Sequence, residues 1–196
     1  MIVIGVTGGL ASGKSTVSKY IKEKYNAYIF DADIEAKQLL QSKKVAKKIL
    51  QAFPEMKFID NHILSSVAFK NNKSQKVLNN IIHPLIEDEI KNRIINKKND
   101  YPFFIVDAAL IIESGSLNKL KESSMKLIVI VSSEEDRKKR AQVRGNLSSK
   151  TIDKRMKLQL PDSEKIKYAD FVIENNSTKS ELYNNVDTII TTVTND

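Results

Sequence analysis

Short runs of consecutive apolar residues recur along the 196-residue chain, and longer segments with helical spacing of apolar residues separate them. The runs lie at residues 2–6, 27–30, 103–106, 127–131 and 171–173. Runs of this length without polar alternation are typical of strands that are buried on both faces. Because such strands alternate here with helices, the pattern predicts an α/β fold with a parallel sheet of about five strands covered by helices.

The segments between these runs predict the helices. They cover residues 14–24, most of 34–98, several stretches from 134 to 167, and 179–193. Breaks in the long helical segment are expected at Pro54, Asn61 and Pro84, where residues that favour turns occur. Ser133 precedes three acidic residues, and this order favours a helix N-terminus.

No internal repeat, low-complexity tract or linker rich in proline and glycine divides the chain. Its length and its apolar content of 41% predict a single domain over residues 1–196, in which about 34–98 form a helical insertion. No apolar stretch approaches the about 20 residues that cross a bilayer, and the first apolar run lacks the basic segment of a signal peptide. We therefore expect a cytoplasmic protein without a membrane partner.

The absence of cysteine excludes thiol catalysis, disulfides and cysteine-ligated zinc, and two histidines make a histidine-rich metal site unexpected. The net charge of +8 favours an anionic partner, such as a nucleic acid, a phosphorylated metabolite or a nucleotide. Only five of the 32 basic residues are arginines, and four of them fall within 19 residues. The scattered lysines are expected to form a solvated surface, whereas the arginine cluster suggests contacts with phosphate.

Residues Gly8 to Ser15 read G-G-L-A-S-G-K-S and fit the phosphate-loop pattern G-x-x-x-x-G-K-[ST]. Gly8 and Gly13 permit the backbone angles that turn successive N–H groups toward a phosphate, and the following helix adds its positive end. Lys14 is expected to reach the β- and γ-phosphates, and the Ser15 hydroxyl is expected to bind Mg²⁺. The pattern therefore predicts a protein that binds a nucleoside triphosphate.

Features of other phosphate-loop proteins are missing from the sequence. A guanine-specific GTPase usually carries N-K-x-D, which does not occur in the chain. A motor or helicase ATPase usually ends a strand in Asp-Glu, whereas Asp107 is followed by Ala108. A small-molecule kinase remains, and it needs an acceptor site, a group that orients the acceptor hydroxyl, and a cationic lid. Asp107 is then either a residue that supports the metal or a turn residue.

The helix expected from residue 134 is the candidate lid. Arg137, Arg140 and Arg144 are spaced i, i+3 and i+7, so they lie on one helical face. If this face closed over ATP, it would neutralise the transferring phosphoryl group and exclude water. The alternative is a solvated basic face that pairs with the acidic residues at 134–136. With a phosphate loop in the same chain, we favour a lid of about residues 134–160.

Asp31 and Asp33 follow the second strand, at the edge of a parallel sheet where ligands bind. One of these carboxylates could accept the proton of the acceptor hydroxyl, and the other could hold Mg²⁺ through water. Asp33 could equally be the N-cap of the next helix, and the two roles can coexist.

This combination resembles the dephospho-coenzyme A kinase family over nearly the whole chain. The resemblance rests on the loop from Gly5 to Thr16, the D-A-D run 31–33, His83-Pro84, Leu110-Ile111-Ile112-Glu113, Arg140 with Arg144, Arg155 with Gln159, and Ala169-Asp170 with Asn175. The chain departs from the family pattern at Ala109, where proline is usual, at Arg137, where glutamine is usual, and at Lys37, where arginine is common. Without these motifs, His83 would read as a helix-start residue and Glu113 as a surface charge.

The resemblance implies a P-loop kinase fold that phosphorylates the 3′-hydroxyl of dephospho-CoA, with ATP and Mg²⁺. Asp33 would act as the base, and Lys14 and Arg140 would be the other catalytic residues. Nucleotide contacts are expected from Gly9, Ala11, Ser12, Gly13, Lys14, Ser15, Thr16, Arg144 and Asn175. Acceptor contacts are expected from Asp33, Lys37, His83 and Leu110, and metal contacts from Ser15 and Asp31.

The sequence also allows two other functions. One is a nucleoside or nucleotide kinase with a different acceptor. The other is a basic nucleic-acid-binding module, although an aromatic content of 7% leaves few residues on which bases could stack. We therefore expect dephospho-CoA as the partner, no nucleic acid, and a monomer by default.

Overall fold

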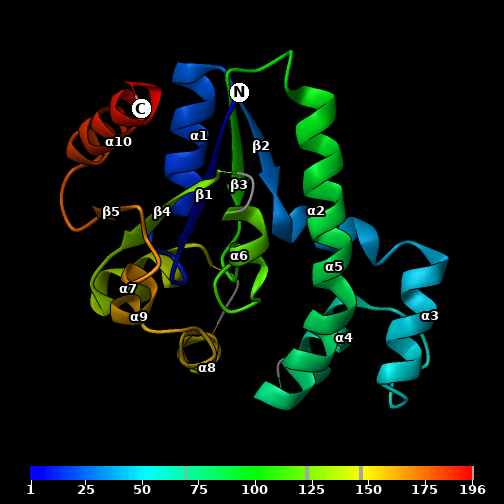
Figure 1. Cartoon of the computed structure of the whole chain (residues 1–196). Helices are drawn as coiled ribbons and strands as arrows, with labels where there is room; N and C mark the ends of the chain where they lie inside the picture. Colours follow the sequence, from blue (N-terminus) through cyan, green and yellow to red (C-terminus); the bar gives the residue numbers. More distant parts are fainter. Residues whose placement is uncertain (69, 122–123, 146–147, 196) are drawn as a thin grey trace. The chain divides into compact units, whose positions relative to one another are not determined.

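The computed structural model describes residues 1–68, 70–121, 124–145 and 148–195. The chain forms two compact units, which Figure 1 shows in the colours of the sequence. The first unit comprises Met1–Phe30 and Ile94–Asp196, and the second comprises Asp31–Arg93. The second unit overlaps the helical insertion that the sequence predicts at about 34–98.

The first unit is built on a five-stranded sheet in the order β2-β3-β1-β4-β5. Its strands are β1 (Ile2–Gly8), β2 (Ala27–Asp31), β3 (Phe103–Asp107), β4 (Lys126–Val131) and β5 (Phe171–Glu174). The pairings of β1 with β3, of β1 with β4, and of β4 with β5 are parallel. All five apolar runs of the sequence are therefore strands, as predicted.

The connections between strands change direction at the carboxyl end of β1. From β1 the chain passes through α1 (Lys14–Tyr25) to β2 at one edge, whereas β4, on the other side of β1, leads to β5 at the opposite edge. Where neighbouring strands send their connections in opposite directions, the chain ends of the strands leave a crevice that binds ligands. The loop from Gly8 to Gly13 begins at this point.

One face of the sheet is covered by α1 and α10 (Lys179–Asn195), which lie next to each other in Figure 1. Val17 and Ile21 of α1 pack with Val186 and Ile190 of α10 against alternate residues of the central strands, among them Ile4. All five side chains are buried, and burying a side chain of this size contributes about 1.5–3 kcal/mol. This apolar layer fixes the start of α1 relative to the sheet.

A polar network on the outer side joins the same two helices. The carboxylate of Asp187 in α10 accepts hydrogen bonds from Tyr25 Oη at 2.7 Å, Lys24 Nζ at 2.7 Å and Tyr20 Oη at 2.9 Å. The Tyr20 ring also stacks on Tyr183, with ring centroids 3.8 Å apart. The network therefore ties the C-terminal helix to the end of α1.

Three shorter helices follow β4: α7 (Glu134–Val143), α8 (Ser149–Lys157) and α9 (Asp162–Ile166). Ser133 caps α7 as predicted, because its hydroxyl accepts a hydrogen bond from the Asp136 N–H at 3.1 Å. The hydrophobic pattern did not predict α6 (Ser116–Lys121), which buries Leu117 and Leu120. With only six residues, α6 is too short to show a helical period.

The second unit is helical, with α2 (Ala32–Leu39), α3 (Lys43–Ala52), α4 (Asn61–Ala68) and most of α5 (Asn72–Lys97). The breaks expected at Pro54 and Asn61 are confirmed, since α3 ends before the first and α4 begins at the second. The break expected at Pro84 is wrong, because α5 continues through it. Proline removes one backbone hydrogen bond, but the buried stripe of Ile82, Ile86 and Ile90 holds the helix on both sides of it. None of the helices, within the described residues, is long and apolar enough to cross a membrane.

Candidate active site

The loop between β1 and α1 has a backbone that only glycine can adopt at two points. Gly8 has a φ of +150° and Gly13 a φ of +113°. A Cβ on Gly8 would meet the Ile130 carbonyl, and a Cβ on Gly13 would meet the side-chain amide of Asn175. Both the dihedral angles and the space therefore demand glycine at these positions.

The first turn of α1 is open to an anion. Gly13 is the N-cap and offers no side-chain hydrogen bond, and the first turn contains no acidic residue. The first N–H groups of a helix lack partners within the helix and carry its positive partial charge. Such an end, preceded by a glycine-rich loop, is a phosphate-binding site.

Lys14 and Ser12 add polar groups to the same loop. The Lys14 ammonium donates to the carbonyl oxygens of Gly8 at 3.1 Å and Gly9 at 3.2 Å, so it lies over the loop. The buried Ser12 hydroxyl has no hydrogen-bond partner among the described residues. A phosphate group would supply acceptor oxygens for both side chains. Ala11, Ser12 and the glycines are buried, whereas Ser15 is exposed at the start of the helix.

Asn175 connects the phosphate loop to α7. Its side-chain amide donates to the Ser12 carbonyl at 2.7 Å, which fixes the turn into α1. The backbone carbonyl of Asn175 accepts hydrogen bonds from Arg140 Nη2 at 2.8 Å and from the Ser132 hydroxyl at 2.9 Å. Arg140 also donates to the Ser132 hydroxyl at 3.0 Å. The structure therefore brings together two predicted site residues, Asn175 and Arg140, and adds Ser132, which the sequence did not indicate.

The other two arginines of α7 differ in their surroundings. Arg144 is the C-cap of α7 and is exposed. Arg137 is 8% exposed, and it donates to the Leu10 carbonyl and pairs with Asp162. The alternative of a solvated basic face is therefore wrong for Arg137. A guanidinium held in this way is bound to the backbone of the loop at Leu10.

Asp107, at the end of β3, lies beside the first turns of α1. Its carboxylate accepts a hydrogen bond from the buried Ser18 hydroxyl at 2.9 Å, and Ser18 is one helical turn after Ser15. Asp107 is the last residue of β3, so it is not a plain turn residue, and its role in supporting a metal stays a prediction. Across the described residues there is no group of three or more His, Cys, Asp or Glu side chains that could hold a metal alone. Mg²⁺ does not require one, because it is usually bound through one or two protein oxygens together with substrate phosphates and water.

The segment after β3 contains a buried ion pair. Lys165 of α9 is fully buried, and its Nζ lies 2.6 Å from Glu113 Oε1 and 3.2 Å from the Ala109 carbonyl. Glu113 Oε1 also accepts from the Leu160 N–H at 3.1 Å. Reading Glu113 as a surface charge is therefore wrong. The half-buried Leu110, a predicted acceptor contact, lies in the segment that this pair anchors.

The remaining predicted residues belong to the second unit, Asp31–Arg93. Asp31 is the N-cap of α2, and its Oδ1 accepts from the N–H groups of Asp33 and Ile34, both at 3.0 Å. The N-cap role considered for Asp33 is therefore wrong, because α2 begins at Ala32, two residues earlier than the expected start at residue 34. Asp33 and Lys37 are exposed on the first and second turns of α2, four residues apart.

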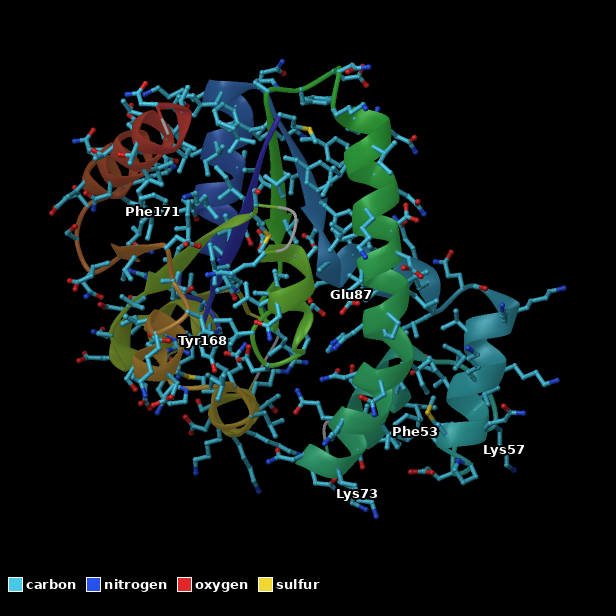
Figure 2. All side chains as sticks on the ribbon, viewed as in Figure 1. Phe53, Lys57, Lys73, Glu87, Tyr168 and Phe171 are labelled. Atoms are coloured by element: carbon cyan, nitrogen blue, oxygen red, sulfur yellow. The ribbon has the colours of Figure 1, made fainter. Side chains whose placement is uncertain are left out.

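His83 is half-buried in the middle of α5. Its alternative reading as a helix-start residue is therefore wrong, for the same reason that the break at Pro84 is wrong. The buried Glu87, labelled in Figure 2, follows one turn later on the same helix. Two polar residues at this spacing lie on one face of α5.

Comparisons with known proteins agree with this geometry. Residues 2–181 match the family model described as dephospho-CoA kinase. A dephospho-CoA kinase from Fusobacterium nucleatum subsp. nucleatum is 36% identical over 198 residues, with 98% of this chain and 99% of the relative covered. Among solved structures, TT1252 from Thermus thermophilus has a TM-score of 0.81 and 25% identity, with 97% and 96% of the two chains covered. A dephospho-CoA kinase from Campylobacter jejuni has a TM-score of 0.64 and 29% identity, again with 97% and 96% covered.

Proposed function

The chain belongs to the dephospho-CoA kinase family, and we propose that it transfers the terminal phosphoryl group of ATP to the 3′-hydroxyl of dephospho-CoA. The observation that supports this most is the glycine-built loop, whose helix N-terminus has no acidic residue and whose Lys14 ammonium lies over the loop. In the reaction the hydroxyl oxygen bonds to the γ-phosphorus, the bond from that phosphorus to the bridging oxygen breaks, and ADP leaves.

On the nucleotide side, Lys14 and N–H groups of the loop from Gly9 to Thr16 bind the phosphates, apart from the N–H of Leu10, which is bound to Gln159. Arg140 stabilises the charge on the transferring group, and Arg144, exposed at the end of α7, adds a second guanidinium. Asn175 holds the loop end through Ser12 and lines the nucleotide site. Phosphoryl transfer requires cations that neutralise the charge of the transferring phosphoryl group and do not themselves react.

On the acceptor side, Asp33 orients the 3′-hydroxyl and takes its proton, while Lys37, His83 and Leu110 contact the acceptor. An exposed carboxylate on the first turn of α2 can perform this role once the acceptor is bound. Between residues 36 and 86 the chain has nine lysines and only two acidic residues, so this segment carries much of the positive charge of the protein. Lys57 and Lys73 in Figure 2 show how these side chains extend into solvent. Such a surface attracts an acceptor that carries a pyrophosphate.

The residues near the start of α1 fit a magnesium ion. Ser15 offers an exposed hydroxyl beside the phosphate loop, and Asp107 places a carboxylate next to the same helix. Ser15 would bind the ion directly and Asp31 would bind it through water. When bound, Mg²⁺ neutralises charge on the β- and γ-phosphates. We expect the enzyme to act as a cytoplasmic monomer, without nucleic acid.

A panel of acceptors tests the function directly. ADP release from Mg-ATP is measured with dephospho-CoA, AMP, adenosine, other nucleosides, and no acceptor. Strong stimulation by dephospho-CoA alone is expected. Stimulation by another acceptor would retain the kinase and discard the proposed substrate, and equal release without an acceptor would contradict phosphoryl transfer altogether.

Two substitutions test the assignment of roles. Asp33→Asn is expected to lower kcat about 100-fold or more with little change in ATP affinity, because a general base acts in the transition state. Lys14→Ala is expected to lower both kcat and the affinity for ATP. Asp88→Asn is the matched control, since Asp88 is an exposed carboxylate of the same unit on α5. Near-normal kcat in Asp33→Asn would show that another group orients the hydroxyl.

A further inference from the structure

Two side chains from distant parts of the sequence hold the tip of the phosphate loop. The N–H of Leu10 donates to Gln159 Oε1 at 2.7 Å, and the Leu10 carbonyl accepts from Arg137 Nε at 3.0 Å. Both backbone polar groups of Leu10 are therefore bound by side chains. We call Arg137 and Gln159 the Leu10 clamp.

The Arg137 guanidinium is held in place by further contacts. Nη1 lies 3.3 Å from both carboxylate oxygens of Asp162, the first residue of α9. The guanidinium also fills the space that a Cβ on Gly9 would need. Its charge is thus neutralised and its orientation is set before any nucleotide binds. Arg137 acts on the loop backbone, and it is not a free cation for the phosphates.

Apolar contacts reinforce the clamp. Ala11 of the loop packs with Ala141 of α7 and Ile152 of α8, and Leu10 and Met156 cover this small cluster. α7 and α8 contact each other. The loop therefore rests on the same helices that carry Arg137 and precede Gln159.

The loop conformation needs such support. Ala11 has a φ of +58°, in the left-handed region that residues with a side chain disfavour. A conformation of this kind persists only where its surroundings enforce it. The fixed N–H and carbonyl of Leu10, directly before Ala11, provide that constraint.

We propose that Arg137 and Gln159 are positioning residues, which hold the phosphate loop in the conformation that receives ATP. Neither residue needs to contact the nucleotide, because each acts through Leu10. The proposal rests on the proposed function, and it adds a requirement that the phosphate-loop pattern does not contain. Loss of the clamp should therefore weaken the use of ATP and leave the use of the acceptor unchanged.

Calorimetric titration with Mg-ATP, in the absence of any acceptor, tests the clamp. Arg137→Ala and Gln159→Ala are each expected to raise the Kd for Mg-ATP about 10-fold, as loss of a partly buried hydrogen bond implies. The double variant is expected to lose less than the product of the two single effects, because both residues act through the same backbone unit. Steady-state kinetics should show a raised KM for ATP and an unchanged KM for dephospho-CoA.

Three further variants separate positioning from general damage. Lys139→Ala removes an exposed cation of α7 that pairs with Glu135, and it should leave ATP binding unchanged. Arg137→Gln retains an N–H donor for Leu10 and should recover part of the affinity that Arg137→Ala loses. If Arg137→Ala does not fold, the half-buried and neutral Gln159 carries the test alone.

The proposal would be overturned if folded Gln159→Ala bound Mg-ATP as tightly as the wild type. It would also be overturned if the two single effects multiplied in the double variant, or if both KM values rose together. A different experimental result is expected if the proposed function is wrong. In that case the wild type binds Mg-ATP but does not release ADP with dephospho-CoA, and the titration of the clamp variants can still be interpreted.

Discussion

Replacing Lys165 with methionine should destabilise the protein strongly, although the residue is far from the phosphate loop in sequence. Methionine fills a similar volume but removes the ammonium that faces Glu113. The Lys165 side chain is 0% exposed and that of Glu113 is 13% exposed. The second oxygen of Glu113 already lacks a hydrogen-bond partner among the described residues. Without Lys165, the carboxylate would keep only the Leu160 N–H of its two hydrogen-bond donors.

The expected magnitude follows from this burial. Removing one member of a buried ion pair costs about 3–5 kcal/mol, because the remaining charge is neither hydrated nor paired. Lys165→Met should therefore lower the free energy of unfolding by that amount. The double variant Lys165→Met with Glu113→Gln should recover more than half of the loss, since no buried charge then remains.

Urea unfolding monitored by circular dichroism measures these differences, because the chain has no tryptophan for fluorescence. The matched control is Lys167→Met. Lys167 Nζ lies 2.8 Å from Glu164, with side chains 65% and 45% exposed, and an exposed pair contributes about 0–1 kcal/mol. If Lys165→Met cost no more than Lys167→Met, the reasoning from burial would be refuted.

Three further predictions concern the loop, the helix pair and the metal. Gly13→Ala should abolish measurable Mg-ATP binding by calorimetry while the protein stays folded, because a Cβ would displace Asn175 and the φ of +113° is strained; binding like the wild type would contradict this. Asp187→Asn should cost about 1–2 kcal/mol at pH 7 in urea unfolding. Although burial alone would raise the pKa of the Asp187 carboxyl, hydrogen bonds from α1 lower it, so its contribution is present above the unfolded pKa and disappears as the pH falls below about 4. A difference between wild type and variant that did not shrink in acid would contradict that cause. Ser15→Ala should raise the Mg²⁺ concentration needed for half-maximal ADP release about 10-fold, whereas an unchanged requirement would exclude Ser15 as a ligand.

The sheet could be predicted because a buried parallel strand has a local signal in the sequence. Each strand is a short run of apolar residues, and the carboxyl end of β1 carries the glycines that the loop geometry demands. The continuation of α5 through Pro84 could not be predicted in the same way. It depends on how strongly Ile82, Ile86 and Ile90 are buried, and burial is a property of the fold.

The contacts of the charged residues that support the site could not be predicted from the sequence either. Lys165 and Glu113 are 52 residues apart, and Arg137 and Leu10 are 127 apart, so no local spacing relates them. A lysine in a polar segment reads as a solvated residue, although this one is fully buried. One signal was present for Arg137, since arginine is rare in this chain and clustered in one segment.

The central claim is that phosphate is transferred to the ribose of dephospho-CoA, and phosphorus NMR of the reaction products tests it most directly. The purified protein is incubated with Mg-ATP and dephospho-CoA until ADP release stops. We predict one new phosphomonoester at the ribose 3′-position, in an amount equal to the ADP formed. ADP accompanied by inorganic phosphate, or a phosphomonoester at another position, would contradict it.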